Sequence, residues 1–183
     1  YPGTDLPHDP NPANQAKAFA ELLDALEIDR AYILCTSAGG AAGLRFALDY
    51  PERTKGLILL SSGVPDQKRT AEEIEKMGRQ GPPSFLVNDF VMWFSVKHFG
   101  FVFDAMMGAK LDNSALLATM LPANPRKAGV LADTTMTNID MTLNYDQYPI
   151  ENLNCRVLVI HAKDDPMAKY QAVEKLLGRV RAE

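Results

Sequence analysis

The chain has 183 residues, of which 46% are apolar, and a formal net charge of −4 at pH 7. This length and apolar content are sufficient for one folded domain with a buried core, and the interspersed charges form no basic patch of the kind that binds nucleic acid. No apolar run approaches the roughly 20 residues that a membrane-spanning helix needs.

The first third of the chain predicts the order helix, strand, helix, strand. Residues 1–12 contain four prolines and predict a loop, and Asn11-Pro12 predicts a helix start. Apolar residues at helical spacing predict an amphipathic helix of about 14 residues after Asn11. The residues of that face are Ala16, Phe19, Ala20, Leu23 and Leu26. The apolar runs AYILC (31–35) and GLILLSS (56–62) predict strands buried on both faces, separated by a helix over 38–50 that Pro51 ends.

A long helical excursion follows before the third strand. Residues 66–150 contain seven of the eight methionines, six of the eight phenylalanines and the only tryptophan, Trp93. The pattern predicts helices at 70–79, 84–98, 112–121 and 125–139, then a strand at CRVLVIHA (155–162) and a last helix over 168–181. We interpret the excursion as a helical insertion between two sheet strands. Its Met and Phe side chains pack the helices together or, alternatively, line an adaptable apolar pocket.

These elements predict an α/β fold, with a parallel sheet flanked by helices and right-handed crossovers. Three strands would leave two open edges, so we expect further strands outside these residues. Cys35 and Cys155 lie in or beside predicted strands, where we expect buried thiols in a reducing compartment rather than a disulfide or metal site. The opening residues do not resemble a signal peptide, and we therefore expect a cytoplasmic protein without a membrane span.

One serine lies where the first strand is expected to give way to a helix. A serine hydroxyl attacks a carbonyl only when a base takes its proton and the resulting oxyanion is stabilised. A sharp strand-to-helix turn exposes the side chain and directs the following amide hydrogens toward the reacting oxygen. Ser37 and its compact neighbours Cys35 and Gly39 fit such a turn, and the Ala38 N–H is the expected oxyanion donor.

The motif CTSAGG, followed by FALDYPERTKGLILLSS, resembles the serine branch of the α/β-hydrolase superfamily. The resemblance covers most of residues 1–66 and 150–183, and residues 67–149 occupy the place of the family's helical cap. It implies a nucleophile elbow at Ser37, although Cys35 replaces the first glycine of G-x-S-x-G. It also implies no cofactor and a small-molecule substrate.

The resemblance further implies a catalytic acid after the third strand. The family pattern G-x-x-D corresponds to Ala162-Lys163-Asp164-Asp165 and favours Asp165 over Asp164. The family's histidine follows the acid, but residues 166–183 contain none. His161, His98 and His8 are the only histidines, and none occupies the expected place of the base. We therefore expect a partial hydrolase that lacks the catalytic histidine and the second oxyanion donor.

Three functions remain open from the sequence. The first is a serine hydrolase that cleaves a small, rather apolar ester or a related acyl or C–C substrate through an acyl-enzyme; haloperoxidase-type activity would use the same triad. The second is a non-catalytic binding or regulatory protein on the same scaffold. The third, nucleotide binding at the glycine-rich segment 38–43, is disfavoured because the next strand ends in SSG, without an acid for a ribose.

Overall fold

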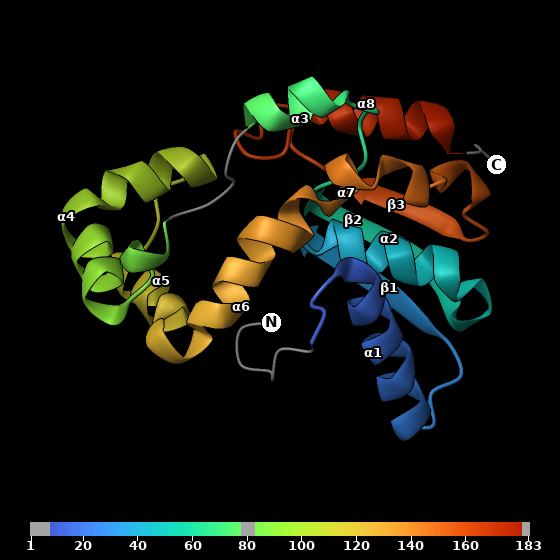
Figure 1. Ribbon diagram of the computed structural model, residues 1–183, viewed down its shortest axis with the longest axis horizontal. Helices are drawn as coiled ribbons and strands as arrows, with labels where there is room; N and C mark the ends of the chain where they lie inside the picture. Colours follow the sequence, from blue (N-terminus) through green and yellow to red (C-terminus); the bar gives the residue numbers. More distant parts are fainter. Residues whose placement is uncertain (1–7, 78–82, 181–183) are drawn as a thin grey trace.

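The computed structural model of the protein describes residues 8–77 and 83–180 (Figure 1). Helices and strands alternate along the part of the chain that forms the sheet, as expected for an α/β fold. The bounds are α1 Pro12–Ala25, β1 Ala31–Ser37, α2 Gly40–Asp49, β2 Thr54–Ser62, β3 Arg156–Ile160 and α8 Tyr170–Arg179. Short 3-10 turns lie at Pro51–Arg53, Ser84–Leu86, Asn124–Arg126, Tyr145–Gln147 and Ile150–Asn152.

Helix α1 begins where the sequence predicts. The Asn11 side chain accepts a hydrogen bond from the Asn14 backbone N–H at 2.8 Å, and Pro12 occupies the first helical position. The predicted apolar face is only partly buried: Ala16 and Ala20 pack against Phe46 of α2. Leu23 is partly buried against the same cluster, whereas Phe19 and Leu26 of that face are 44% and 58% exposed.

The three strands form a parallel sheet in the order β1-β2-β3. The predicted parallel α/β fold is therefore confirmed. In such a sheet the carboxyl ends of all strands lie at one edge, so the residues that follow β1, β2 and β3 meet there.

Only one face of the sheet is covered by described helices, which contradicts the prediction of double burial. Cys35, Leu57 and Leu59 face α2 and α8 and form the main core with Leu44 and Leu176. The alternate side chains point to the opposite face and are about half exposed or more: Tyr32, Leu34, Leu158 and Ile160. The helices α1, α2 and α8 all pack on the first face, which leaves the second open.

Residues between β2 and β3 are helical, as predicted. The helices are α3 Ala71–Met77, α4 Asp89–Met107, α5 Asn113–Met120, α6 Lys127–Ala132 and α7 Asn138–Leu143, with a π-helical turn at Asp133–Thr137. Figure 1 shows α4 and α5 standing apart from the sheet. The end of the predicted helix 70–79 lies outside the described residues. Within the described ranges, no helix combines the length and apolarity needed to span a membrane.

Helix α4 is longer than the sequence predicts. It continues to Met107 instead of ending near residue 98, although Phe99 has the non-helical angles φ −124° and ψ 29°. Gly100 follows this kink, and a Cβ there would lie 2.7 Å from the Asn113 amide nitrogen. The kinked segment therefore lies directly against the start of α5, and α4 consists of two helical parts that meet at Phe99.

Candidate active site

Ser37 is the last residue of β1 and has a left-handed backbone conformation, with φ 49°. Such a conformation is strained for a residue other than glycine and persists only where the surroundings enforce it. The residue is exposed, and α2 begins three positions later at Gly40. Ser37 thus lies in a sharp strand-to-helix turn that presents its hydroxyl to solvent.

The peptide group after Ser37 is held by the end of β2. The Ser37 carbonyl accepts hydrogen bonds from the Ser62 hydroxyl at 3.0 Å and from the Gly63 N–H at 2.9 Å. In a trans peptide the N–H points opposite to the carbonyl. The Ala38 N–H is therefore directed away from β2, in an orientation that the two bonds fix.

The next two residues let this turn form. The Gly39 N–H donates to the Thr36 carbonyl at 2.8 Å and closes the turn, so this amide is committed to the fold. A Cβ on Gly40 would lie 2.0 Å from the Gly63 carbonyl oxygen. Only glycine at position 40 allows α2 to start this close to the end of β2.

Cys35 is accommodated by a second close approach. A Cβ on Gly43, one turn into α2, would lie 1.9 Å from the Cys35 Sγ. The sulfur occupies the space that this glycine leaves, which explains how a cysteine fits two residues before Ser37. Burial raises the pKa of the Cys35 thiol to about 11, so it remains protonated and unreactive near neutral pH.

Asp165 lies in the turn after β3, at the same sheet edge as Ser37. Its Oδ1 accepts the backbone N–H groups of Ala168 at 2.8 Å and Met167 at 2.9 Å. The Ala168 N–H, and then that of Met167, lower the pKa of Asp165, helped by His161 and a hydrogen bond from Ser61. Asp165 is therefore held as an oriented carboxylate.

The neighbouring Asp164 differs from Asp165 in its surroundings. Asp164 is exposed, whereas the Asp165 side chain is only 12% exposed and is held by the turn. This contrast supports the choice of Asp165 that the sequence spacing favoured.

The three histidines lie in different surroundings. The His161 side chain is buried beside the Asp165 turn, and its Nε2 bonds the Ala168 carbonyl at 2.7 Å. His98 is exposed on α4 and contacts Phe94 in a tilted arrangement with ring centroids 4.6 Å apart, and His8 is exposed in the opening loop. Within residues 8–77 and 83–180, the structure gives no hydrogen bond between a histidine and Ser37.

Two points of the helical segment reach this edge of the sheet. Gly108 ends α4, and a Cβ there would lie 3.4 Å from the Pro166 Cδ, beside Asp165. A Cβ on Gly63 would lie 3.4 Å from the Met141 Cε of α7 and 3.8 Å from the Ser37 carbonyl oxygen. Ser62, Gly63 and Met141 were not predicted from the sequence as parts of the site. The small residues at the end of β2 were the one available signal.

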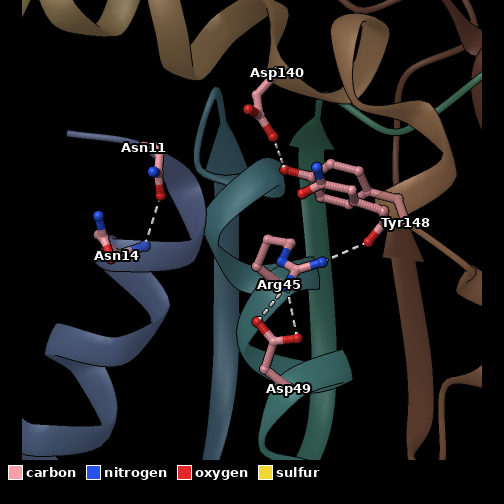
Figure 2. A network of polar contacts seen from close by, with 7 residues as sticks. Asn11, Asn14, Arg45, Asp49, Asp140 and Tyr148 are labelled. Atoms are coloured by element: carbon pink, nitrogen blue, oxygen red, sulfur yellow. Dashed lines mark hydrogen bonds and ion pairs between the residues drawn. The ribbon is translucent and has the colours of Figure 1, made fainter. Parts of the chain in front are cut away.

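A polar network ties α7 to the sheet domain, as Figure 2 shows. Arg45 of α2 pairs with both oxygens of Asp49 at 2.8 Å and donates to the Gln147 carbonyl at 2.6 Å. The fully buried Tyr148 donates its hydroxyl to the Asp140 carboxylate of α7, and burial is the main cause that raises its pKa. These contacts fix the end of the helical segment against α2.

The described residues contain no group of three His, Cys, Asp or Glu side chains that could hold a metal ion. Cys35 and Cys155 are free thiols. The arrangement is thus one exposed hydroxyl and one oriented carboxylate at a common sheet edge.

Comparison with known proteins places the chain in a family. The chain is 25% identical over 178 residues to a putative carbamate hydrolase of Caulobacter vibrioides, and the match covers 92% of this chain and 60% of that protein. A segment of 48 residues is 50% identical to a 2-hydroxy-6-oxo-6-phenylhexa-2,4-dienoate hydrolase of Burkholderia cepacia, covering 26% of this chain and 17% of that protein.

Solved structures agree on the fold. A putative lipase of Acinetobacter baumannii has a TM-score of 0.64 at 16% identity, covering 93% of this chain and 56% of that one. An α/β hydrolase fold protein of Nakamurella multipartita has a TM-score of 0.54 at 19% identity, covering 93% and 64%. The chain thus spans about 60% of the length of the proteins that it matches from end to end. The family model for the alpha/beta hydrolase fold matches residues 4–180, and the chain belongs to this family of hydrolases.

Proposed function

We propose that the protein is a serine hydrolase in which Ser37 is the nucleophile and Asp165 the acid of a catalytic triad. The observation that carries the proposal is the exposed Ser37 at φ 49° between strand and helix. The Asp165 carboxylate lies at the same sheet edge, after the strand that follows β2 in the sheet order. The Ala38 N–H, in the turn that Gly39 closes, is the oxyanion donor.

In the proposed reaction the Ser37 Oγ attacks the substrate carbonyl carbon while a histidine takes the hydroxyl proton. The tetrahedral oxyanion accepts the Ala38 N–H, and collapse breaks the bond to the leaving group, which receives the proton. Water then attacks the acyl-enzyme, the histidine again moves the proton, and the acid product leaves with Ser37 restored. The scheme uses no cofactor.

The base of this scheme is a histidine outside the present 183 residues. His161 is bonded to the Ala168 carbonyl, while His98 and His8 are exposed away from any described acid partner. The Caulobacter vibrioides relative, of which the match covers 60%, is longer than this chain, which leaves room for the base and for a second oxyanion donor.

We further propose that residues 67–149 form a cap over a core made of residues 1–66 and 150–183. The approach of Gly108 to Pro166 and of Met141 to Gly63 supports this division. The apolar aromatic side chains of α4 favour a small, rather apolar ester or a related acyl or C–C substrate. The name of the Burkholderia cepacia relative, with its phenyl-bearing dienoate, fits the same class.

Labelling of the intact protein by a fluorophosphonate probe tests the proposal. We expect one serine to be labelled, with the label lost in Ser37→Ala and retained in the control Ser114→Ala, an exposed serine on α5. Labelling that survives Ser37→Ala would refute the assigned nucleophile. Complete absence of labelling in the wild-type protein would favour the binding-protein alternative.

A further inference from the structure

We infer that His161 is a positioning residue that holds the Asp165 carboxylate in its orientation through the Ala168 backbone. The inference concerns the acid of the proposed triad and rests on that function for its catalytic meaning. Its structural part is a hydrogen bond between His161 and Ala168 that closes the turn of residues 161–168. This bond, the latch, can be tested whether or not the proposed function holds.

The bond that forms the latch has a defined direction. His161 follows the last residue of β3, and its side chain is only 2% exposed. Its Nε2 lies 2.7 Å from the Ala168 carbonyl oxygen. A carbonyl can only accept, so Nε2 carries the hydrogen and donates it.

Ala168 transmits this bond to the acid. Its own N–H donates to the Asp165 Oδ1 at 2.8 Å, while its carbonyl is held by His161. The Asp165 N–H in turn donates to the Ala162 carbonyl at 3.3 Å. The turn is thus pinned to the end of the rigid strand, and the carboxylate is fixed by donors that the latch keeps in place.

His161 acts on Asp165 through this backbone and does not hydrogen-bond it directly. The His161 Nε2 is 3.7 Å from the Asp165 Oδ2, beyond hydrogen-bonding distance, and the Ala168 oxygen is an angstrom closer. The geometry therefore identifies the carbonyl as the partner.

The other ring nitrogen of His161 bears on why a histidine, and not an apolar residue, stands at this position. Nδ1 of His161 is buried, and within the described residues it has no hydrogen-bond partner. A buried polar atom without a partner destabilises the folded state, and an apolar side chain would avoid that cost. The hydrogen bond to Ala168 is a contact that an apolar residue could not make.

Two substitutions of similar chemistry separate the latch from simple packing. The His161→Gln side chain carries an amide nitrogen near the position of Nε2 and can donate to Ala168 without any charge. The His161→Asn nitrogen corresponds instead to Nδ1 and cannot reach that carbonyl. His161→Phe, which keeps the ring volume without a donor, replaces Asn if the smaller side chain prevents folding.

Backbone amide exchange and the carboxyl titration of Asp165, both measured by NMR on the intact protein, are the readouts. For His161→Asn or Phe we expect at least tenfold faster exchange at Met167 and Ala168 and an Asp165 pKa closer to its ordinary value. His161→Gln should keep wild-type exchange at both amides. Its Asp165 pKa should lie between those of the wild type and the Phe variant, because the amide hydrogen bonds stay while the charge contribution of His161 is lost. In an active enzyme, kcat should fall in the Asn and Phe variants with KM unchanged.

The results also separate this inference from the proposed function. Wild-type exchange and titration in His161→Asn and Phe would overturn the latch, and so would a Gln variant that behaves like them. Absence of fluorophosphonate labelling in the wild type would count against Ser37 as a nucleophile, but the exchange comparison would remain valid.

Discussion

The contact between Cys35 and Gly43 predicts a strong energetic coupling at the turn that carries Ser37. A Cβ on Gly43 would lie 1.9 Å from the Cys35 Sγ, far inside van der Waals contact, and Cys35 is buried. With alanine at position 35 only the Cβ of that side chain remains, and it would lie 3.5 Å from the new Cβ at position 43, an ordinary contact. Gly43→Ala should therefore be damaging with cysteine at position 35 and harmless with alanine.

The expected magnitude follows from opposing effects. Overpacking a buried site costs about 1–3 kcal/mol, whereas replacing glycine by alanine inside a helix gains up to about 1 kcal/mol. Gly43→Ala alone should thus lower the free energy of unfolding by up to about 3 kcal/mol. Cys35→Ala should cost about 1 kcal/mol for the lost sulfur packing. In the double variant the clash disappears, which gives a coupling energy of about 1–3 kcal/mol.

A double-mutant cycle measured by urea unfolding checks this value. Gly178→Ala on α8 is the matched control, because a Cβ at that position would have no atom within 4 Å and only the helix gain, up to about 1 kcal/mol, applies. If Gly43→Ala has the same effect within about 0.5 kcal/mol in both backgrounds, the sulfur moves aside freely and the reasoning is wrong.

Three further predictions concern other parts of the molecule. Tyr148→Phe removes the part-buried hydrogen bond to Asp140 and should lower the free energy of unfolding in denaturant by about 1–2 kcal/mol; an unchanged midpoint would contradict this. The Asp165 pKa is lowered by folding, so the stability deficit of Asp165→Asn should be largest above about pH 4 and vanish as the pH falls through the folded-state pKa. Thermal melts of the wild type and the variant across pH test this, and a deficit that persists unchanged at low pH would contradict it. Leu34→Lys on the open sheet face should weaken binding of the dye ANS by the 183-residue chain while changing stability by less than about 0.5 kcal/mol; equal dye binding would argue against this face as its site.

The order of the elements was predictable because local signals mark their ends. Asn11-Pro12 starts α1 and Pro51 follows α2, as the sequence indicates. The burial of the strands was not predictable in the same way. An apolar run such as AYILC has the same sequence whether one face or both faces meet a helix, since only the tertiary arrangement decides it.

The sequence identified candidate site residues only where they belong to a recognisable motif. Ser37 ends one strand and Asp165 follows another, at positions that are recognisable in the sequence. The contacts that hold them are made to backbone groups: Ser62 bonds the Ser37 carbonyl, and His161 bonds the Ala168 carbonyl. Any residue offers a carbonyl, so such partners leave no trace in the sequence and require the fold.

The sheet order gives the end of β2 a structural role that the sequence did not indicate. In the sequence, SSG served only to exclude an acid, yet β2 lies between β1 and β3 and supports both sides of the candidate site. Ser62 and Gly63 hold the Ser37 carbonyl, and Ser61 makes the smallest of the contributions that lower the pKa of Asp165. A larger acidic residue at this point would compete for the same space and charge. Small residues at the end of the middle strand therefore leave room at this edge for Ser37 on one side and for the Asp165 turn on the other.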